Sequence, residues 1–205
     1  MKQNSIKIIG LTGGIATGKS TVSNILKEYD YIVIDADDLS RLVVEKNKPA
    51  YNDILKLFGK EILNGNGEID REKLGRIIFS DKNLRNKLNN IVHPRIYESI
   101  RKEIEKHKNN KEKVIFIDIP LLIEVKEKLE KENIVFDEIW LVYASKDQQV
   151  ERLINRNEYS KKEALDRINS QINIEEKIRY CDRIIDNSKD IKYTKEQLKR
   201  ELKKI

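Results

Sequence analysis

The sequence predicts an α/β fold in which helices cover both faces of a parallel β-sheet. Five short apolar segments are strand candidates, at residues 7–11, 31–34, 114–117, 138–142 and 183–185. Most of them alternate with segments whose apolar residues recur every three or four positions, as in an amphipathic helix. This alternation is typical of parallel strands that are connected by helices.

Three later helices are expected to begin with capping boxes. In this motif a Ser or Thr and a Glu or Gln three residues further on bond each other's backbone amides. The candidate pairs are Ser145 with Gln148, Ser160 with Glu163, and Thr194 with Gln197. Residues 38–112 interrupt the alternation, because they show helical patterns and a GNGE turn at 65–68 but no strand candidate. We expect them to form an inserted helical subdomain.

The composition predicts a globular protein with a highly charged surface, because 39 % of the 205 residues are hydrophobic and 37 % are charged. No apolar run approaches the roughly 18 residues of a membrane span, and the apolar stretch near the amino end is too short for a signal peptide. Cys181 is the only cysteine, which excludes an intramolecular disulfide and a thiolate metal cluster. We therefore expect a cytoplasmic protein without a membrane partner.

The net charge of +6 is compatible with nucleic acid, an anionic membrane face or phosphate-rich small ligands. Much of the lysine is spread over helical segments, so solvated helix faces explain most of the charge. The chain lacks a compact group of lysines and arginines interleaved with aromatic residues, which is typical of nucleic-acid binding. We expect no nucleic-acid partner, and a nucleic-acid-binding ATPase remains an alternative.

Residues 13–20, GGIATGKS, fit the pattern G-x-x-x-x-G-K-[ST] of a phosphate-binding loop. A strand candidate precedes this loop, and a helical pattern over residues 18–28 follows it. Such a loop turns successive backbone N–H groups toward a phosphate, and the next helix adds its free N–H groups and positive end. Lys19 can reach the β- and γ-phosphates, and the Ser20 hydroxyl can bind the bridging Mg²⁺. The expected nucleotide-binding residues are Gly13, Gly14, Ala16, Thr17, Gly18, Lys19, Ser20 and Thr21.

A regulatory GTPase is not supported by the rest of the chain. Such a protein normally carries Asp-x-x-Gly and Asn-Lys-x-Asp motifs. Here no glycine has an aspartate three positions before it, and the NKPA segment at 47–50 lacks the final aspartate that would bind guanine.

Two strand candidates end in carboxylates. Asp35, Asp37 and Asp38 follow the second candidate, and Asp118 follows the third, just before Pro120 opens a helical pattern. The carboxyl ends of parallel strands face the same crevice as the phosphate-binding loop. One carboxylate could accept a proton from an attacking hydroxyl, and Asp118 could hold Mg²⁺ through water. Helix N-caps at Asp37 or Asp38 and at Asp118 fit the same pattern equally well.

Two arginines indicate a lid. Arg152 and Arg156 are four residues apart in a helical segment and lie opposite its apolar face, and a polar segment containing Arg167 follows. Two guanidinium groups on one face suit a lid that closes on phosphates. Solvated surface is the alternative for such arginines, but the phosphate-binding loop favours the lid.

Together these segments resemble the dephospho-coenzyme A kinase family over nearly the whole chain. The resemblance rests on six segments in order: LTGGIATGKS, IDADDLSR, IFSD…LNNIVHP, DIPLLIE, QVERLINR…S…EA…RI…Q and IIDN. It implies a P-loop core with a helical acceptor-binding insertion and a lid. The implied reaction transfers the γ-phosphate of ATP to the ribose 3′-hydroxyl of dephospho-CoA, which gives coenzyme A and ADP in the last step of coenzyme A biosynthesis.

The resemblance also implies residue roles. Asp37 looks like the base near the 3′-hydroxyl, and Lys19 and Arg156 are the other implied catalytic residues. The lid arginines, Arg152 and Arg156, look like contacts to ATP phosphates, and Asn187 looks like a nucleotide contact. The implied acceptor-binding residues are Asp35, Asp37, Arg41, His93, Pro94 and Leu121, and the implied metal ligands are Ser20 and Asp118. A histidine before a proline is also typical of a point where one helix ends and another starts.

Two positions depart from the family pattern. Ala16 and Thr17 stand where some members have Gly-Ser, a change that should leave the backbone cradle intact. Lys189 stands where a glycine is expected, which affects the adenine-side loop.

The implied domains are a nucleotide-binding core at 1–37, 113–145 and 178–205, an acceptor-binding insertion at 38–112 and a lid at 146–177. The implied substrates are ATP, with Mg²⁺, and dephospho-CoA, and the expected state is a monomer. Other small-molecule P-loop kinases, such as nucleotide or shikimate kinases, are alternatives that share the loop but lack this acceptor segment.

Overall fold

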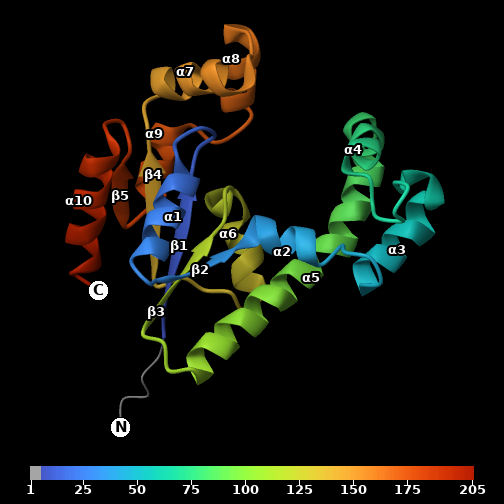
Figure 1. Ribbon diagram of the computed structural model, residues 1–205, viewed down its shortest axis with the longest axis horizontal. Helices are drawn as coiled ribbons and strands as arrows, with labels where there is room; N and C mark the ends of the chain where they lie inside the picture. The colour runs from blue at the N-terminus through green and yellow to red at the C-terminus, as the bar shows by residue number, and fades with distance from the viewer. Residues whose placement is uncertain (1–5) are drawn as a thin grey trace. The chain divides into compact units, whose positions relative to one another are not determined.

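The computed structural model describes residues 6–205, which divide into two compact units (Figure 1). The core unit comprises the chain up to Ile34 and from Lys106 to Ile205, and the helical unit comprises Asp35–Glu105. Residues 1–5, which the sequence assigns to the nucleotide-binding core, lie outside the described residues.

A five-stranded parallel sheet forms the centre of the core unit, with the strand order β2-β3-β1-β4-β5. The strands are β1 (Lys7–Gly13), β2 (Ile32–Asp35), β3 (Val114–Asp118), β4 (Glu138–Tyr143) and β5 (Arg183–Asp186). All five expected strands are therefore confirmed. β1 is the central strand, and the two strands that pair with it, β3 and β4, lie on opposite sides of it. The loop after β1 therefore lies at the point where the strand order reverses. In a parallel sheet this is where ligands bind.

Helices cover both faces of the sheet (Figure 1). The helices that lie wholly in the core unit are α1 (Lys19–Glu28), α6 (Leu122–Lys131), α7 (Lys146–Asn157), α8 (Lys161–Asn169), α9 (Ile174–Lys177) and α10 (Ile191–Leu202), with a 3₁₀ turn, η2, at Ile178–Tyr180. Ile9 and Leu11 of β1 point to one face, where α1 and α10 bury them in the main core. Gly10 points to the opposite face, where a Cβ would meet Leu122 of α6. The sequence alternation of β1 thus separates the two helical layers.

The helical unit has its own hydrophobic core. Its helices are α2 (Ala36–Leu42), α3 (Pro49–Phe58), α4 (Arg71–Ser80) and α5 (Lys82–Asn109), whose last residues belong to the core unit, with a 3₁₀ turn, η1, at Lys60–Ile62. Ile54, Phe58 and Leu88 are among the residues buried between them. The expected GNGE turn is present, and the Tyr51 hydroxyl donates a hydrogen bond to the Gly67 carbonyl across it (2.5 Å).

Pro94 lies inside α5 instead of separating two helices, so that alternative for the His-Pro pair is wrong. A proline inside a helix removes one N–H donor and disturbs the preceding turn. The N–H that Pro94 lacks would bond the Asn90 carbonyl. The Arg95 guanidinium adds a side-chain hydrogen bond to the next carbonyl, that of Ile91 (2.6 Å). The helix continues through the proline.

The expected capping boxes of α7 and α8 are confirmed, with Ser145 and Ser160 as N-caps. The third expected capping box, Thr194 with Gln197, is wrong. Helix α10 begins three residues before Thr194, and its N-cap is Asp190, which accepts a hydrogen bond from the Tyr193 amide. The Thr194 hydroxyl is buried and donates to the side chain of Asn187 instead (2.9 Å).

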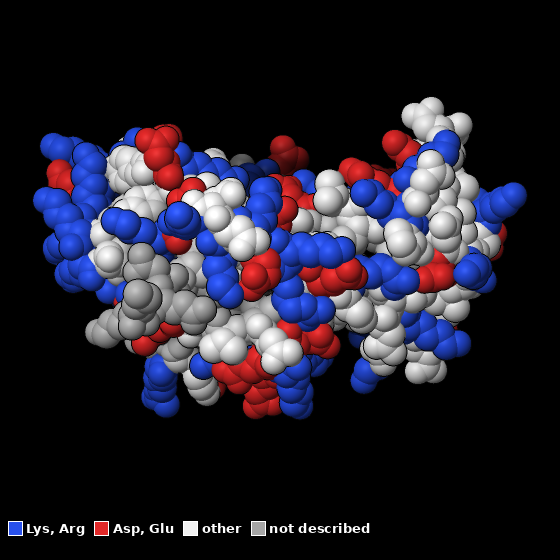
Figure 2. Space-filling model, turned by 90° about the horizontal axis from the view of Figure 1, so that it is seen from below, with Lys and Arg blue, Asp and Glu red and all other residues white. Residues whose placement is uncertain are grey.

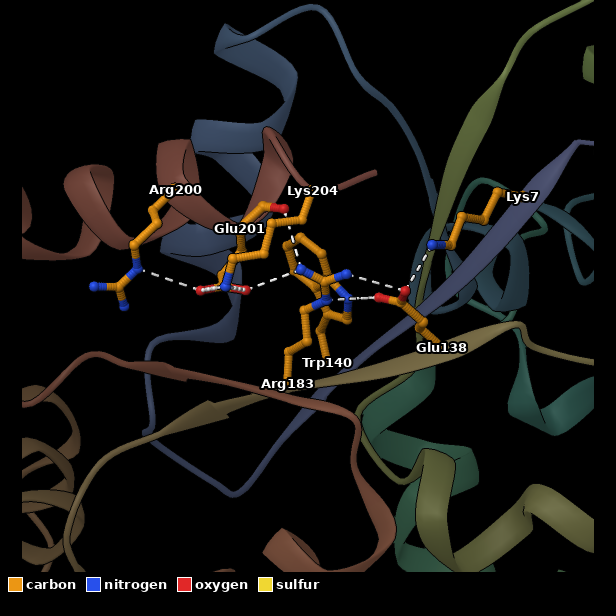
Figure 3. A network of polar contacts seen from close by, with 7 residues as sticks. All are labelled: Lys7, Glu138, Trp140, Arg183, Arg200, Glu201 and Lys204. Carbon is orange, nitrogen blue, oxygen red and sulfur yellow. Dashed lines mark hydrogen bonds and ion pairs between the residues drawn. The ribbon is translucent and has the colours of Figure 1, made fainter.

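A polar network joins the amino ends of β1, β4 and β5 to α10 (Figure 3). Glu138 accepts hydrogen bonds from Arg183 Nε (2.7 Å), Lys7 Nζ (2.6 Å) and Trp140 Nε1 (2.8 Å). The same Arg183 guanidinium also donates to Glu201 of α10 (2.9 Å). The bond from Arg183, more than the other two, lowers the pKa of Glu138 to about 2.

Within residues 6–205, no helix is both long enough and apolar enough to span a bilayer. On the face shown in Figure 2, Lys and Arg side chains are spread widely, with Asp and Glu side chains between them.

Candidate active site

The phosphate-binding loop connects β1 to α1 and is built on two left-handed backbone positions. Gly18 has a φ of 89°, and a Cβ there would collide with the Asn187 side chain, so a glycine is required. Ala16 has a φ of 59°, which is uncommon for a residue with a Cβ. The buried Thr17 hydroxyl donates to the Gly14 carbonyl and closes the loop on itself (2.9 Å). The loop conformation is therefore stabilised in part by a contact within the loop.

Lys19 and Asp118 form an ion pair at the carboxyl ends of β1 and β3. Asp118 is only 1 % exposed, and its second carboxylate oxygen accepts a hydrogen bond from the Ser23 hydroxyl of α1. Asp118 is not a helix cap, because α6 begins at Leu122 after an N-cap residue that makes no side-chain bond. Pro120 does not open the helix either, and its carbonyl accepts a bond from Thr12.

Arg152 of α7 contacts the loop itself. One terminal nitrogen of its guanidinium donates to the Ala16 and Thr17 carbonyls (3.2 and 3.1 Å), and the other donates to the Asn187 carbonyl (2.6 Å). The buried Asn187 side chain in turn donates to the Thr17 carbonyl (2.8 Å). Arg152 and Asn187 therefore grip the outer side of the loop. The alternative that Arg152 is only a solvated surface residue is therefore wrong.

Arg156 lies one turn further along α7 and is exposed, with its Nε bonded to the neighbouring Asn157 side chain (2.8 Å). The two arginines line one cavity of 470 Å³ together with loop residues. The other residues that line it are Ala16, Gly18, Thr21, Asn155 and Asn187. The structure thus brings most of the expected nucleotide-binding residues to one opening. Lys189 is exposed and lies over the Tyr193 ring (4.4 Å).

The segment that carries the arginines packs as a helical pair. Val150 and Leu153 of α7 contact Ala164 and Ile168 of α8 in a separate apolar cluster. Arg167, which the sequence places in the polar part of the lid, stacks on the Tyr159 ring at 4.4 Å. Its guanidinium therefore has a packing role in this structure.

In the helical unit, Asp35 caps α2 by accepting hydrogen bonds from the amides of Asp37 (2.8 Å) and Asp38 (3.2 Å). The expectation of a cap at Asp37 or Asp38 is therefore wrong by two or three positions. The side chains of both residues are exposed. Capping thus occupies the first carboxylate of the group and leaves Asp37 available for chemistry.

The other expected acceptor residues lie in both units. Arg41 is close to Asp38 on the exposed surface of α2 (3.7 Å), and the His93 ring lies 6.0 Å from the Tyr97 ring on α5. Pro94 lines a cavity of 640 Å³ within the helical unit, whose basic lining residues are Lys48, Arg95, Arg101 and Lys102. Leu121 is in the core unit, is 40 % exposed and precedes α6.

Sequence reasoning missed Ser23, Gln171 and Lys177 among the residues that contact the loop or its partner Asp118. Ser23 is one turn after Ser20 and could have been found as a polar residue on the buried face of α1. Gln171 ends the segment QVERLINR…S…EA…RI…Q, although the sequence alone does not link it to the loop. Lys177 has no such signal, because it lies more than 150 residues from the loop.

A family model for dephospho-CoA kinase matches residues 7–193. The chain is 46 % identical over 197 residues to a dephospho-CoA kinase of Oceanobacillus iheyensis, covering 96 % of each chain. It is 45 % identical over 193 residues to one of Carboxydothermus hydrogenoformans, covering 94 % of this chain and 91 % of that protein. The solved structure of a dephospho-CoA kinase from Campylobacter jejuni has a TM-score of 0.67 at 26 % identity, covering 98 % of this chain and 97 % of that one.

Proposed function

This chain belongs to the dephospho-CoA kinase family, and we propose on that premise that it transfers the γ-phosphate of ATP to the ribose 3′-hydroxyl of dephospho-CoA, the last step of coenzyme A biosynthesis. The observation that carries the proposal from the structure is the phosphate-binding loop with Lys19 at its mouth and two arginines on the adjoining helix. Phosphoryl transfer needs positioning and charge neutralisation more than covalent chemistry from the protein. This site offers both.

The nucleotide would be held by the amides of the loop and the first turn of α1. Lys19 would exchange its contact with Asp118 for contacts to the β- and γ-phosphates when ATP binds. Arg156 would neutralise charge that develops on the transferred group, because it is exposed, lines the cavity and is hydrogen-bonded only locally, to the adjacent Asn157, in the contacts described above. Arg152 would keep the loop in shape.

The residues fit a magnesium ion that arrives with ATP. The exposed Ser20 hydroxyl on the first turn of α1 and the Asp118 carboxylate are oxygen donors, and Mg²⁺ takes one or two protein oxygens with phosphates and waters as its other ligands. Ser20 would bind the ion directly and Asp118 through water. When bound, Mg²⁺ supplies charge neutralisation across the β- and γ-phosphates.

Asp37 would orient the 3′-hydroxyl and take its proton as transfer proceeds. Two features support this role. Its carboxylate is exposed, and Asp35 has already taken the capping position. Arg41, His93, Pro94 and Leu121 would contact the acceptor, with residues 38–112 as the acceptor-binding insertion and 146–177 as the lid. Both substrates are polyanions, and the net charge of +6 would favour their capture.

We further propose that the protein acts in the cytoplasm as a monomer and has no nucleic-acid partner. Support for the last point comes from the mixing of positive and negative side chains in Figure 2. Retention on DNA or RNA at physiological ionic strength would contradict it.

The test is an ADP-release assay over a panel of acceptors that includes dephospho-CoA, nucleoside monophosphates and shikimate. Turnover is expected with dephospho-CoA alone. If an unrelated acceptor were phosphorylated at an equal rate, the proposed substrate would be wrong.

A further inference from the structure

The segment between the lid helices and β5 lies against the first half of the phosphate-binding loop. Three of its residues, spaced three apart, face three successive residues of the loop: Gln171 faces Ile15, Ile174 faces Gly14, and Lys177 faces Gly13. We call residues 171–177 the loop brace.

Two polar contacts connect the brace to the loop backbone. The Gln171 Oε1 atom accepts a hydrogen bond from the Ile15 amide (3.0 Å), and Lys177 Nζ donates to the Gly13 carbonyl (3.4 Å). Between them, Ile174 packs close enough that a Cβ on Gly14 would lie 3.4 Å from its Cδ1 atom. These contacts restrain both ends of the tripeptide that begins the loop.

The brace is itself anchored. Glu175 accepts a hydrogen bond from the Tyr143 hydroxyl at the end of β4 (2.6 Å), which raises the pKa of Tyr143 to about 12. Lys177 is fully buried, and its Nζ lies 2.8 Å from Glu124 Oε1 on α6. Both carboxylate oxygens of Glu124 are buried, and among the described residues none forms a well-directed hydrogen bond to them. Lys177 is therefore their charge partner.

A buried ion pair of this kind is a poor source of stability. The desolvation of two charges offsets most of their attraction, and apolar residues of the same size often stabilise a fold as well or better. A role in holding the loop explains the pair more directly, since the lysine also contacts Gly13.

We propose that Gln171 and Lys177 are positioning residues that preorganise the first half of the phosphate-binding loop for nucleotide, with Glu124 holding Lys177 in place. The inference rests on the proposed function only in that the loop binds ATP. A loop that is already ordered loses less conformational entropy when it binds a phosphate. Because the brace contacts backbone and not the transferred group, its loss weakens ATP and ADP binding equally.

The experiment measures dissociation constants for Mg·ATP and Mg·ADP by calorimetry without any acceptor, so its outcome does not depend on which acceptor is phosphorylated. Gln171→Leu removes one hydrogen bond at nearly constant size, and we expect the Kd for both nucleotides to rise about fivefold, the effect of one typical hydrogen bond.

The second variant is the double substitution Lys177→Met with Glu124→Gln, compared with Lys177→Met alone. The single change leaves an unpaired buried carboxylate and should lower the Tm strongly. The double change removes that charge, so the Tm should recover while the Kd for both nucleotides stays raised by about fivefold or more. Recovery of both the Tm and the Kd would overturn the proposal.

Arg183→Met is the matched control. It breaks the contacts of Arg183 with Glu138 and Glu201 at the opposite end of the strands, away from the loop. It should lower the Tm without changing the Kd for nucleotide. If it raised the Kd as much as Gln171→Leu does, the effect would reflect lost stability alone, and the brace would have no positioning role.

Discussion

The Lys19 ammonium is ion-paired to Asp118, a carboxylate that is almost completely buried between α1 and the end of β3. The pair holds the positive charge of Lys19 at the opening of the phosphate-binding loop. It also balances the negative charge of a carboxylate that is shielded from solvent. The proposed catalytic role of Lys19 and the stability of the fold therefore depend on one contact, and substitutions can separate them.

Replacement of Lys19 by Met should lower both quantities. The kcat should fall on the order of 10²- to 10³-fold, because a preorganised positive charge on the transferred phosphate is lost. The free energy of unfolding should fall by about 3 kcal/mol, because the buried Asp118 carboxylate loses its ion pair with Lys19. In the double variant with Asp118→Asn, urea unfolding should show recovered stability while kcat stays low. A kcat within a few-fold of the natural enzyme for Lys19→Met would contradict this role of the lysine.

Asp37→Asn tests the proposed base. Asparagine keeps the size and hydrogen bonding of the side chain but cannot accept the proton, so kcat should fall about 10²- to 10⁴-fold with little change in the Kd for Mg·ATP. Asp38→Asn is the matched control, because its carboxylate is the exposed neighbour on the same turn of α2. Near-normal turnover by Asp37→Asn would remove this residue from the mechanism. Weakened Mg²⁺ binding with rescue at high metal would assign it to the metal site instead.

Arg152→Lys and Arg156→Lys should have different effects. A lysine at 152 cannot reproduce the fork that contacts three carbonyls, so the Kd for ATP should rise about tenfold. A lysine at 156 keeps the charge but loses its planar geometry, so the main effect should be on kcat. Nucleotide titrations and steady-state kinetics on the two variants measure both quantities. Identical changes in the two variants would show that Arg152 does not act through the loop.

The stabilisation provided by Glu138 should depend on pH. The contact with Arg183 holds its pKa near 2, below the ordinary value of 4.5, so the ionised group stabilises the folded state above pH 4.5. This stabilisation disappears as the pH falls from there through about 2. Glu138→Gln should therefore lose up to about 3 kcal/mol of unfolding free energy at pH 7 and little near pH 2. Urea unfolding across this range is the measurement, and a difference that grew toward low pH would contradict the prediction.

The strands and the phosphate-binding loop could be predicted because their signals are local. The loop that contains Lys19 is an example. Few structures other than a strand, a phosphate-binding loop and a helix fit an apolar run that is followed by glycines, a lysine and a helical pattern. The helix starts at Ser145 and Ser160 were predictable for the same reason, since both partners of a capping box lie within one turn.

The helix caps and loop contacts that the sequence did not predict depend on competition between nearby residues or on contacts between distant ones. At α10 the N-cap is Asp190, which precedes Thr194 in the chain, and at α2 it is Asp35, the first of three aspartates. The positive φ of Ala16 shows that a glycine would fit this position without strain, whereas the sequence alone predicted only that the change is harmless. Gln171 and Lys177 reach the loop across the fold, and no periodic pattern encodes such a contact.

The single thiol of the chain is poorly reactive. Burial raises the pKa of Cys181 to about 11, and its Sγ lies 3.2 Å from the Lys177 carbonyl. At neutral pH only about one molecule in 10⁴ carries the reactive thiolate. A cysteine introduced at an exposed position of α8, such as Lys162→Cys, would therefore react first with a fluorescent maleimide. The natural chain can thus carry one dye on α8 without removal of its own cysteine, and fluorescence can time any movement of this helix when nucleotide is added.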